Sequence, residues 1–379
     1  MVGEVLTGTP GGSAGRRTGG LAAGEFHPLR VAAVEQLCDD AVAVTFDVPA
    51  DLAPTYRFRP GQYLTLRLMT TGGEERRSYS ICSAAGASPK IGVRRVDGGL
   101  FSPWLVDRLR PAELVEVAPP AGAFTPDLDP GSHHGLIAAG SGITPVLSIA
   151  ASLLAAHSDT RVTLVYGNRR TDTVMFTEEI CDLKNTYRSR LHVIHVLSRE
   201  PTEAQVCSGR LDADKLRTLL GALVDVADID QWWLCGPLGL AEAALAVLTG
   251  PAAASGFGVA RDRVHRELFY VDEPPPELHR PDAVFDGATS EVTVVLNGRA
   301  ATLTLPQATS LLDSAQRVRG DLPFACKGGV CGTCRARVTA GNVRMRRNFA
   351  LEDHEVSAGF VLTCQSVPTS PTVTVDFDA

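Results

Sequence analysis

HHGLIAAGSGITPVLSIAASLLAAH, residues 133–157, combines an apolar strand, a glycine-containing turn and an amphipathic helix in a single stretch. Four more segments read as strands, the third of them running into a helix: 161–170, 191–198, 231–248 and 262–270. Strands that alternate with helices are typical of a parallel, doubly wound sheet. The sequence therefore predicts an α/β domain over residues 132–270.

On the N-terminal side of this domain, the pattern changes to short bursts of alternating polar and apolar residues. Examples are VAVTFDVP at 42–49, YLTLRLM at 63–69 and KIGVRRVD at 90–97, with Gly and Pro between them. Short, closely spaced strands of this kind indicate an antiparallel β-barrel, expected at residues 28–128. Residues 1–27 are rich in Gly, Ser and Thr, which predicts a flexible tail without a secretory signal.

On the C-terminal side, residues 271–288 (VDEPPPELHRPDAVFDGA) are acidic and Pro-rich, the composition of an exposed spacer. The remaining segment, 289–379, is β-like, then helical and then rich in cysteine, which predicts a third domain of the α+β class. The whole chain is thus expected to be a multidomain protein.

Composition excludes several classes of function. The chain has 379 residues, 44% of them hydrophobic, and a net charge of -7, which argues against nucleic acid as the main partner. No stretch approaches the roughly 20 consecutive apolar residues of a membrane span, so no membrane partner is expected. Five of the cysteines are scattered, and free thiols of this kind favour a reducing, cytoplasmic location.

The other four cysteines are gathered near the C-terminus. Cys326, Cys331 and Cys334 have the spacing C-x4-C-x2-C, and Cys364 follows at a longer interval. This is the spacing of a plant-type [2Fe–2S] site, with one loop giving three thiolates and a strand end the fourth. The alternative is structural zinc, which usually needs two C-x2-C hooks, and only one is present. The sequence therefore predicts a [2Fe–2S] ferredoxin domain.

The segment R-x-Y-S at 77–80 has the residues of a flavin site. On a strand, Arg77 and Tyr79 point to one side and Ser80 to the other. The planar fork of Arg77 suits a diphosphate, Tyr79 can stack on an isoalloxazine ring, and the Ser80 hydroxyl can hydrogen-bond near flavin N5. Taken alone the pattern is equally that of an exposed strand.

Two glycine-containing turns precede helices and are candidates for phosphate binding. Gly99 and Ser102 stand at one such turn, where unpaired helix amides attract an anion. Gly140 and Gly142 stand at the other, between the strand GLIAA and the helix that starts near Pro145. Glycine lets the backbone approach a pyrophosphate closely, although the full G-x-G-x-x-G pattern is absent.

Coenzyme preference is expected to be decided where the strand TLVYG ends. An acidic residue there would accept the ribose hydroxyls of NADH. The chain instead has Asn168, Arg169 and Arg170 at this position, followed by Ser198 and Arg199 after the next strand and by Arg210. Arginines favour the 2′-phosphate of NADPH, with NADH as the alternative. The competing interpretation is that Arg169 and Arg170 are solvated loop charges.

These motifs follow one another in the order found in the ferredoxin–NADP reductase superfamily, which the chain resembles over residues 28–270. The matching segments are R-x-Y-S-x-x-S ending at Ser83, G-x-x-S, Pro120–Phe124, Gly140–Pro145 and Cys235–Pro237. The superfamily joins a flavin-binding barrel to a nucleotide-binding α/β domain. The resemblance implies that the flavin is FAD.

The resemblance also implies roles for individual residues. It puts Thr144 beside the nicotinamide, and Cys235, followed by Gly236, near the centre of hydride transfer, where packing is favoured over chemical participation. Glu267 and Phe269 fall near the flavin, and Glu267 either relays a proton or caps a strand. The candidate catalytic residues are therefore Ser80, Thr144, Cys235 and Glu267.

Flavin, nucleotide and cluster modules in this order resemble the reductase components of multicomponent oxygenases. The stretches 209–212, 266–277, 326–334 and 345–366 most resemble the reductase components of phenylacetyl-CoA epoxidases, which supply a di-iron oxygenase. The resemblance thus implies an oxygenase partner and a role in phenylacetate catabolism. Steroid-hydroxylase reductases are the next most similar. Two alternative functions are a redox sensor and a diaphorase with a vestigial cluster. A sensor would need an output element such as a helix-turn-helix, for which the sequence has no candidate. A vestigial cluster would lack one of the four cysteines, and all four are present.

Overall fold

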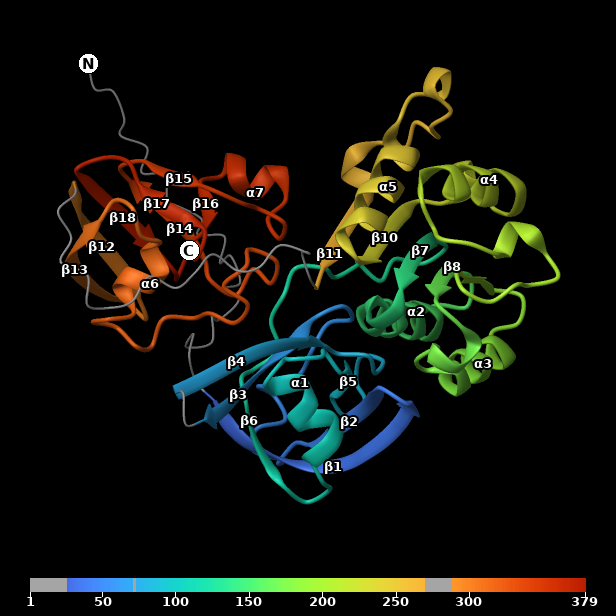
Figure 1. Cartoon of the computed structure of the whole chain (residues 1–379), viewed down its shortest axis with the longest axis horizontal. Coiled ribbons are helices and arrows are strands. Elements are labelled where there is room, and N and C mark those ends of the chain that lie inside the picture. Colours follow the sequence, from blue (N-terminus) through green and yellow to red (C-terminus); the bar gives the residue numbers. More distant parts are fainter. Residues whose placement is uncertain (1–25, 71–72, 270–287) are drawn as a thin grey trace, which may run out of the picture.

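The computed structural model of the chain describes residues 26–70, 73–269 and 288–379, which form three domains (Figure 1). The predicted tail (1–27) and linker (271–288) therefore lie almost entirely outside the described residues. The predicted multidomain fold is confirmed: an antiparallel barrel, a parallel-sheet domain and a β-grasp domain follow one another along the chain.

The first domain is a six-stranded antiparallel sheet that curls into a barrel, in the order β4-β3-β6-β1-β2-β5. An isolated bridge between Ile81 and Ile91 joins the end of β4 to β5 and closes it. A short helix, α1 (Phe101–Pro103), continues as a π-helical segment to Arg108 and buries Phe101 and Leu105 in the barrel. The strands are β1 (His27–Cys38), β2 (Ala41–Asp47), β3 (Tyr63–Thr70), β4 (Gly73–Ser80), β5 (Lys90–Arg94) and β6 (Leu114–Val117).

The second domain has five parallel strands in the order β11-β10-β7-β8-β9. Two apolar clusters cover its faces: residues of α2 and α3 belong to one cluster, and residues of α4 and α5 to the other. The strands are β7 (His133–Ala139), β8 (Arg161–Asn168), β9 (Leu191–Leu197), β10 (Gln231–Gly236) and β11 (Val264–Leu268). The helices are α2 (Ile143–Ala156), α3 (Thr177–Thr186), α4 (Ala213–Leu223) and α5 (Leu238–Thr249).

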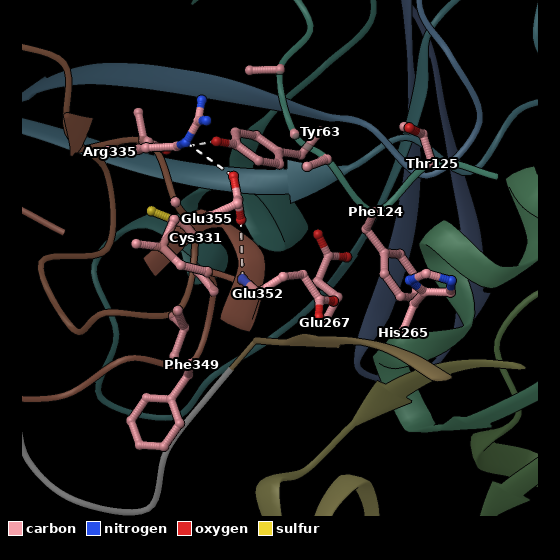
Figure 2. Close-up of a pocket in the computed structure, with 18 of the residues that line it drawn as sticks. Tyr63, Phe124, Thr125, His265, Glu267, Cys331, Arg335, Phe349, Glu352 and Glu355 are labelled. Carbon is pink, nitrogen blue, oxygen red and sulfur yellow. Dashed lines mark hydrogen bonds and ion pairs between the residues drawn. The ribbon is translucent and has the colours of Figure 1, made fainter. Parts of the chain in front are cut away.

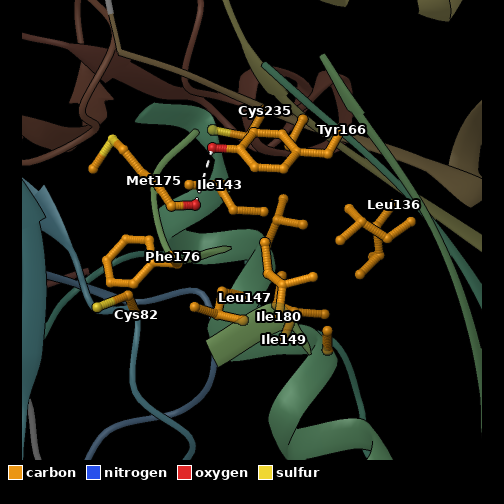
Figure 3. Packing of buried hydrophobic residues seen from close by; sticks show 14 of the residues in the cluster. Cys82, Leu136, Ile143, Leu147, Ile149, Tyr166, Met175, Phe176, Ile180 and Cys235 are labelled. Carbon is orange, nitrogen blue, oxygen red and sulfur yellow. Dashed lines mark hydrogen bonds between the residues drawn. The ribbon is translucent and has the colours of Figure 1, made fainter. Parts of the chain in front are cut away.

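Helix α2 differs from the amphipathic helix predicted at this position, because it is buried on nearly every side (Figure 3). Its polar residues are buried too: the Ser148 hydroxyl donates to the Ser83 carbonyl at 2.7 Å, and the Ser152 hydroxyl accepts from the Ala85 amide at 2.9 Å. Ser83 and Ala85 belong to the barrel. Apart from Ala155 and Ala156 at its C-terminal end, the helix therefore has no exposed residue, since the sheet covers one side and the barrel the other.

The third domain has a five-stranded sheet in the order β13-β12-β18-β14-β16, with a small second sheet formed by β15 and β17. The strands are β12 (Thr289–Leu296), β13 (Arg299–Pro306), β14 (Arg335–Ala340), β15 (Val343–Met345), β16 (Phe360–Leu362), β17 (Ser366–Pro368) and β18 (Thr372–Asp376). The helices are α6 (Leu311–Ala315) and α7 (Asp353–Ser357). Cys334 and Cys364 belong to its apolar core. Within the described part of the chain, no helix has the length and apolar content needed to cross a membrane.

Candidate active site

The barrel and the α/β domain meet where β4 and β11 end. The Ser80 hydroxyl donates a hydrogen bond to Oε2 of Glu267, 3.0 Å away, although 187 positions separate the two residues. Glu267 is paired in register with Cys235 on the neighbouring strand β10. Three of the four candidate catalytic residues are thus neighbours in space.

Burial governs the protonation of this group. It raises the pKa of Glu267 to about 8, and the hydrogen bond from Ser80 opposes the rise. Burial, and to a lesser extent the Glu267 carboxylate, raises the pKa of the Cys235 thiol well above its usual range. A thiol held protonated in this way is a poor nucleophile, so Cys235 is suited to packing.

The glycine turn packs tightly against Cys235. A Cβ atom on Gly142 would lie 2.2 Å from the Cys235 carbonyl oxygen, and Gly140 has a φ of +55°. Thr144 is buried, and its hydroxyl donates to the Ser141 carbonyl at 3.0 Å. The structure therefore brings the fourth candidate, Thr144, to the same edge of the sheet as Cys235.

The residues of R-x-Y-S differ in exposure. Arg77 is 46% exposed and forms an ion pair with Glu75 at 3.0 Å, so its guanidinium is accessible. The Tyr79 ring lies 6.1 Å from that of Phe101, and burial raises the pKa of its hydroxyl. Ser80 is buried.

Five further predicted residues are engaged in local hydrogen bonds or packing. The Ser83 hydroxyl accepts from the Lys90 amide at 3.2 Å, and the Ser102 hydroxyl accepts from the Val96 amide at 3.0 Å. The Gly99 amide donates to the Val96 carbonyl at 3.0 Å. Gly236 is buried, and Phe269 is half-buried against the cluster around α2.

The residues predicted to select the coenzyme lie at the carboxyl ends of β8 and β9. Asn168 is buried, and neither its amide nitrogen nor its oxygen has a partner with hydrogen-bond geometry in the described structure, although it lies close enough to lower the pKa of Tyr166. The Arg199 amide donates to the Arg169 carbonyl at 2.8 Å, so these two exposed residues are adjacent. An unpartnered amide beside two exposed arginines fits a polar, phosphate-bearing nucleotide.

The four gathered cysteines form two pairs of neighbouring thiols: Cys326 with Cys331, and Cys334 with Cys364. The Gly328 amide points at the Cys326 sulfur at 3.3 Å. Across the described ranges, no group of three or more His, Cys, Asp or Glu side chains is arranged around one metal ion. Two pairs of thiols nevertheless fit a cluster of two irons, because each iron needs two protein ligands.

A cavity of about 750 Å³ lies where the three domains meet (Figure 2). Glu267 lines it from the α/β domain, Tyr63 from the barrel, and Cys331 from the third domain. The Tyr63 hydroxyl and that of Thr333 are 2.9 Å apart. Neither residue was predicted from the sequence, although the position of Thr333 between two cluster cysteines was a usable signal.

Comparison with known proteins defines the class to which this architecture belongs. The family described as "Oxidoreductase FAD-binding domain" matches residues 28–125, "Oxidoreductase NAD-binding domain" matches 136–245, and "2Fe-2S iron-sulfur cluster binding domain" matches 294–369. The protein is therefore an oxidoreductase whose redox groups are FAD, a nicotinamide nucleotide and a [2Fe–2S] cluster.

Whole-chain relatives identify the family. One component of the 1,2-phenylacetyl-CoA epoxidase from Escherichia coli (strain K12) is 39% identical over 93% of this chain and 98% of its own length. The ferredoxin reductase component of 3-ketosteroid-9-alpha-monooxygenase from Rhodococcus rhodochrous is 35% identical over 92% of this chain and 96% of its own length. This chain belongs to the same family of oxygenase reductase components, which pass electrons from NAD(P)H through FAD and [2Fe–2S] to an oxygenase component.

A solved structure shows the same fold. Phthalate dioxygenase reductase is similar with a TM-score of 0.57 and 22% identity, covering 93% of this chain and 98% of its own. The order of the three modules is therefore matched over nearly the whole of both chains.

Proposed function

We propose that this protein transfers electrons from NADPH to the di-iron oxygenase of a phenylacetyl-CoA epoxidase, in phenylacetate catabolism in the cytoplasm. The observation that carries the proposal is the 39% identity to a component of such an epoxidase, over 98% of that component's length. The bound groups supply hydride acceptance at the flavin and single-electron carriage at the cluster. One NADPH thus gives two electrons to the oxygenase and releases one proton.

Ser80 and Glu267 are suited to relaying the proton that this reaction releases. With a pKa of about 8, Glu267 is protonated at neutral pH and can exchange its proton with the Ser80 hydroxyl or with the adjoining cavity. Cys235 stays neutral and fills the space between Glu267 and the glycine turn, where Thr144 would border the nicotinamide. We infer that Arg77 and Tyr79 hold the flavin diphosphate and ring.

Preference for NADPH is supported by the charges at the ends of β8 and β9. Among the described residues, Arg169, Arg199 and Arg210 are exposed and form no ion pair with an acidic side chain. Their guanidinium groups are therefore available to a 2′-phosphate. Arg170, by contrast, is engaged with Asp172 at 2.9 Å. Asn168 would complete the site with its unpartnered amide.

The cysteine pairs suggest how the cluster would be held. Cys326 and Cys331 would ligate one iron, and Cys334 and Cys364 the other. The amide of Gly328 would then donate to a ligating sulfur, a contact of the kind that tunes cluster potentials.

The test begins with anaerobic titration of the purified protein, first with NADPH and then with NADH, followed by the visible spectrum. Bleaching of both flavin and cluster at a lower concentration of NADPH is the expected result. A Cys331→Ser variant is expected to lose cytochrome c reduction and keep ferricyanide reduction, whereas the exposed Cys181→Ser control keeps both. Flavin bleaching with no cluster absorbance in wild-type protein would refute the relay.

A steroid-hydroxylase system is the second candidate, favoured by the 35% identity to the Rhodococcus rhodochrous reductase. Reconstitution separates the two candidates. The protein is mixed with the oxygenase of a phenylacetyl-CoA epoxidase or with that of a 3-ketosteroid 9α-hydroxylase, and product is measured. Faster coupled turnover with the steroid oxygenase would overturn the proposed partner.

A further inference from the structure

The loop that carries the first three cluster cysteines, residues 322–334, lies against strands β3 and β4 of the barrel. We call it the cluster loop. At one end, Arg76 donates from Nη1 to the Leu322 carbonyl at 3.5 Å, and its guanidinium lies 4.4 Å from the centre of the Phe324 ring. At the other end, the hydroxyls of Tyr63 and Thr333 are 2.9 Å apart.

Arg76 is only 5% exposed, which is unusual for an arginine. Its charge is balanced by Glu74 on the same strand, and its guanidinium lies over the rings of Phe324 and, at 5.0 Å, Phe26. A guanidinium that is buried against aromatic rings gains more from cation–π attraction than an exposed one. The third domain thus supplies one ring and one carbonyl to a buried cation of the barrel.

The α/β domain holds the same loop from another side. Val330, in the middle of the cluster loop, is buried against Ala241 of α5 and Leu268 of β11. Three contacts from two domains therefore act on one loop, between Leu322 and Thr333. A short loop held at three points has few alternative positions.

The contacts of Arg76 and Tyr63 come from β4, which carries the proposed flavin residues, and from its neighbour β3. Tyr63 is paired in register with Ser80, and Arg76 directly precedes Arg77. We propose that Arg76 and Tyr63 are positioning residues, which hold the cluster loop against the flavin-bearing strands so that an electron passes from reduced flavin to oxidised cluster. This inference rests on the proposed electron relay.

The chain offers a matched control for each variant. Arg67 also stacks on Phe26, at 4.3 Å, and pairs with Glu74 at 3.9 Å, but it makes these contacts within the barrel region. Arg76→Met is therefore compared with Arg67→Met. Tyr63→Phe is compared with Tyr56→Phe, because the Tyr56 hydroxyl donates to the Val117 carbonyl inside the barrel.

The experiment measures three quantities on holoprotein: flavin reduction by NADPH, subsequent cluster reduction, and hydrogen–deuterium exchange of residues 322–334. We expect Arg76→Met and Tyr63→Phe to slow cluster reduction about tenfold with flavin reduction unchanged, because the docked population falls. Exchange in the cluster loop should accelerate in the same variants. The two control variants should match wild type in both the cluster step and loop exchange.

Phe324→Ala approaches the same contact from the other domain. If Arg76 acts through this ring, adding Phe324→Ala to Arg76→Met slows cluster reduction less than the product of the two single effects. The inference would be overturned if the effects of Arg76→Met and Phe324→Ala on the rate multiply in the double variant. It would also be overturned if Arg76→Met and Tyr63→Phe reduce the cluster at the wild-type rate, or reduce it more slowly without faster exchange in the cluster loop. Failure of NADPH to reduce the cluster in wild-type protein would instead overturn the proposed relay.

Discussion

Gly142→Ala is expected to disable hydride transfer without any change at a candidate catalytic residue. A Cβ atom at position 142 would lie 2.2 Å from the carbonyl oxygen of Cys235, 2.6 Å from its carbonyl carbon and 2.9 Å from the Gly236 nitrogen. Ordinary contacts of a Cβ atom begin at 3.4 Å. Because all three atoms belong to the backbone of β10, no side-chain rotation relieves the clash, and the turn or the strand must move by about 1 Å.

Either movement displaces the proposed nicotinamide site. The turn leads into α2 and Thr144, and β10 carries Cys235. A misplacement of about 1 Å can cost ~100-fold in rate, so we expect flavin reduction by NADPH to slow by about two orders of magnitude. Overpacking should also destabilise the domain by roughly 1–3 kcal/mol. Stopped-flow absorbance at saturating NADPH and thermal unfolding measure the two effects.

The matched control is Gly221→Ala in α4, where an added Cβ would meet no atom within 4 Å. This variant should keep the wild-type rate and gain about 0.4–1 kcal/mol of stability, since alanine restricts the unfolded chain. Gly142→Ala protein that reduces its flavin at the wild-type rate and unfolds at the wild-type temperature would refute the reasoning.

Glu267→Gln should be more heat-stable than wild type at pH 8 and similar to it near pH 4.5. In wild type, the carboxyl of the unfolded chain ionises above pH 4.5, whereas that of the folded chain keeps its proton up to about pH 8. Wild type therefore loses stability between these two pH values, and the variant does not. Unfolding temperatures of both proteins that change in parallel from pH 4.5 to 8 would contradict this. Arg169→Glu should raise the KM for NADPH about tenfold and leave the KM for NADH nearly unchanged, because only NADPH has a 2′-phosphate. Steady-state reduction of ferricyanide measures both KM values, and equal changes in the two would count against a role for Arg169 in binding the 2′-phosphate. Phe176→Ala should destabilise the protein by about 3–5 kcal/mol, since this fully buried ring packs between the barrel and the α/β domain; an unchanged unfolding temperature would show that the contact is dispensable.

The α/β domain shows which features of the fold could be predicted from the sequence and which could not. The apolar run GLIAA and the glycine turn predicted β7 and the start of α2, because strand and helix periods are local properties of a chain. The same reasoning made α2 amphipathic, which was wrong. Its second face is covered by the barrel, and no local pattern reports a neighbouring domain.

In the candidate site, too, some features could be predicted from the sequence and others could not. Spacing alone gathered Cys326, Cys331 and Cys334, since ligands on one short loop are close for any fold that orders the loop. By contrast, the roles of Ser83 and Ser102 in local hydrogen bonding were visible only in the structure.

By itself, then, the sequence determined the three modules and their order, and it supplied the candidate residues for each cofactor site, because these depend on short-range pattern and spacing. Only the tertiary structure decided which of those residues meet. Ser80 reaches Glu267 across 187 positions, and Tyr63 reaches Thr333 across 270. Such contacts arise from the packing of one domain on another, a long-range property that the local sequence does not encode.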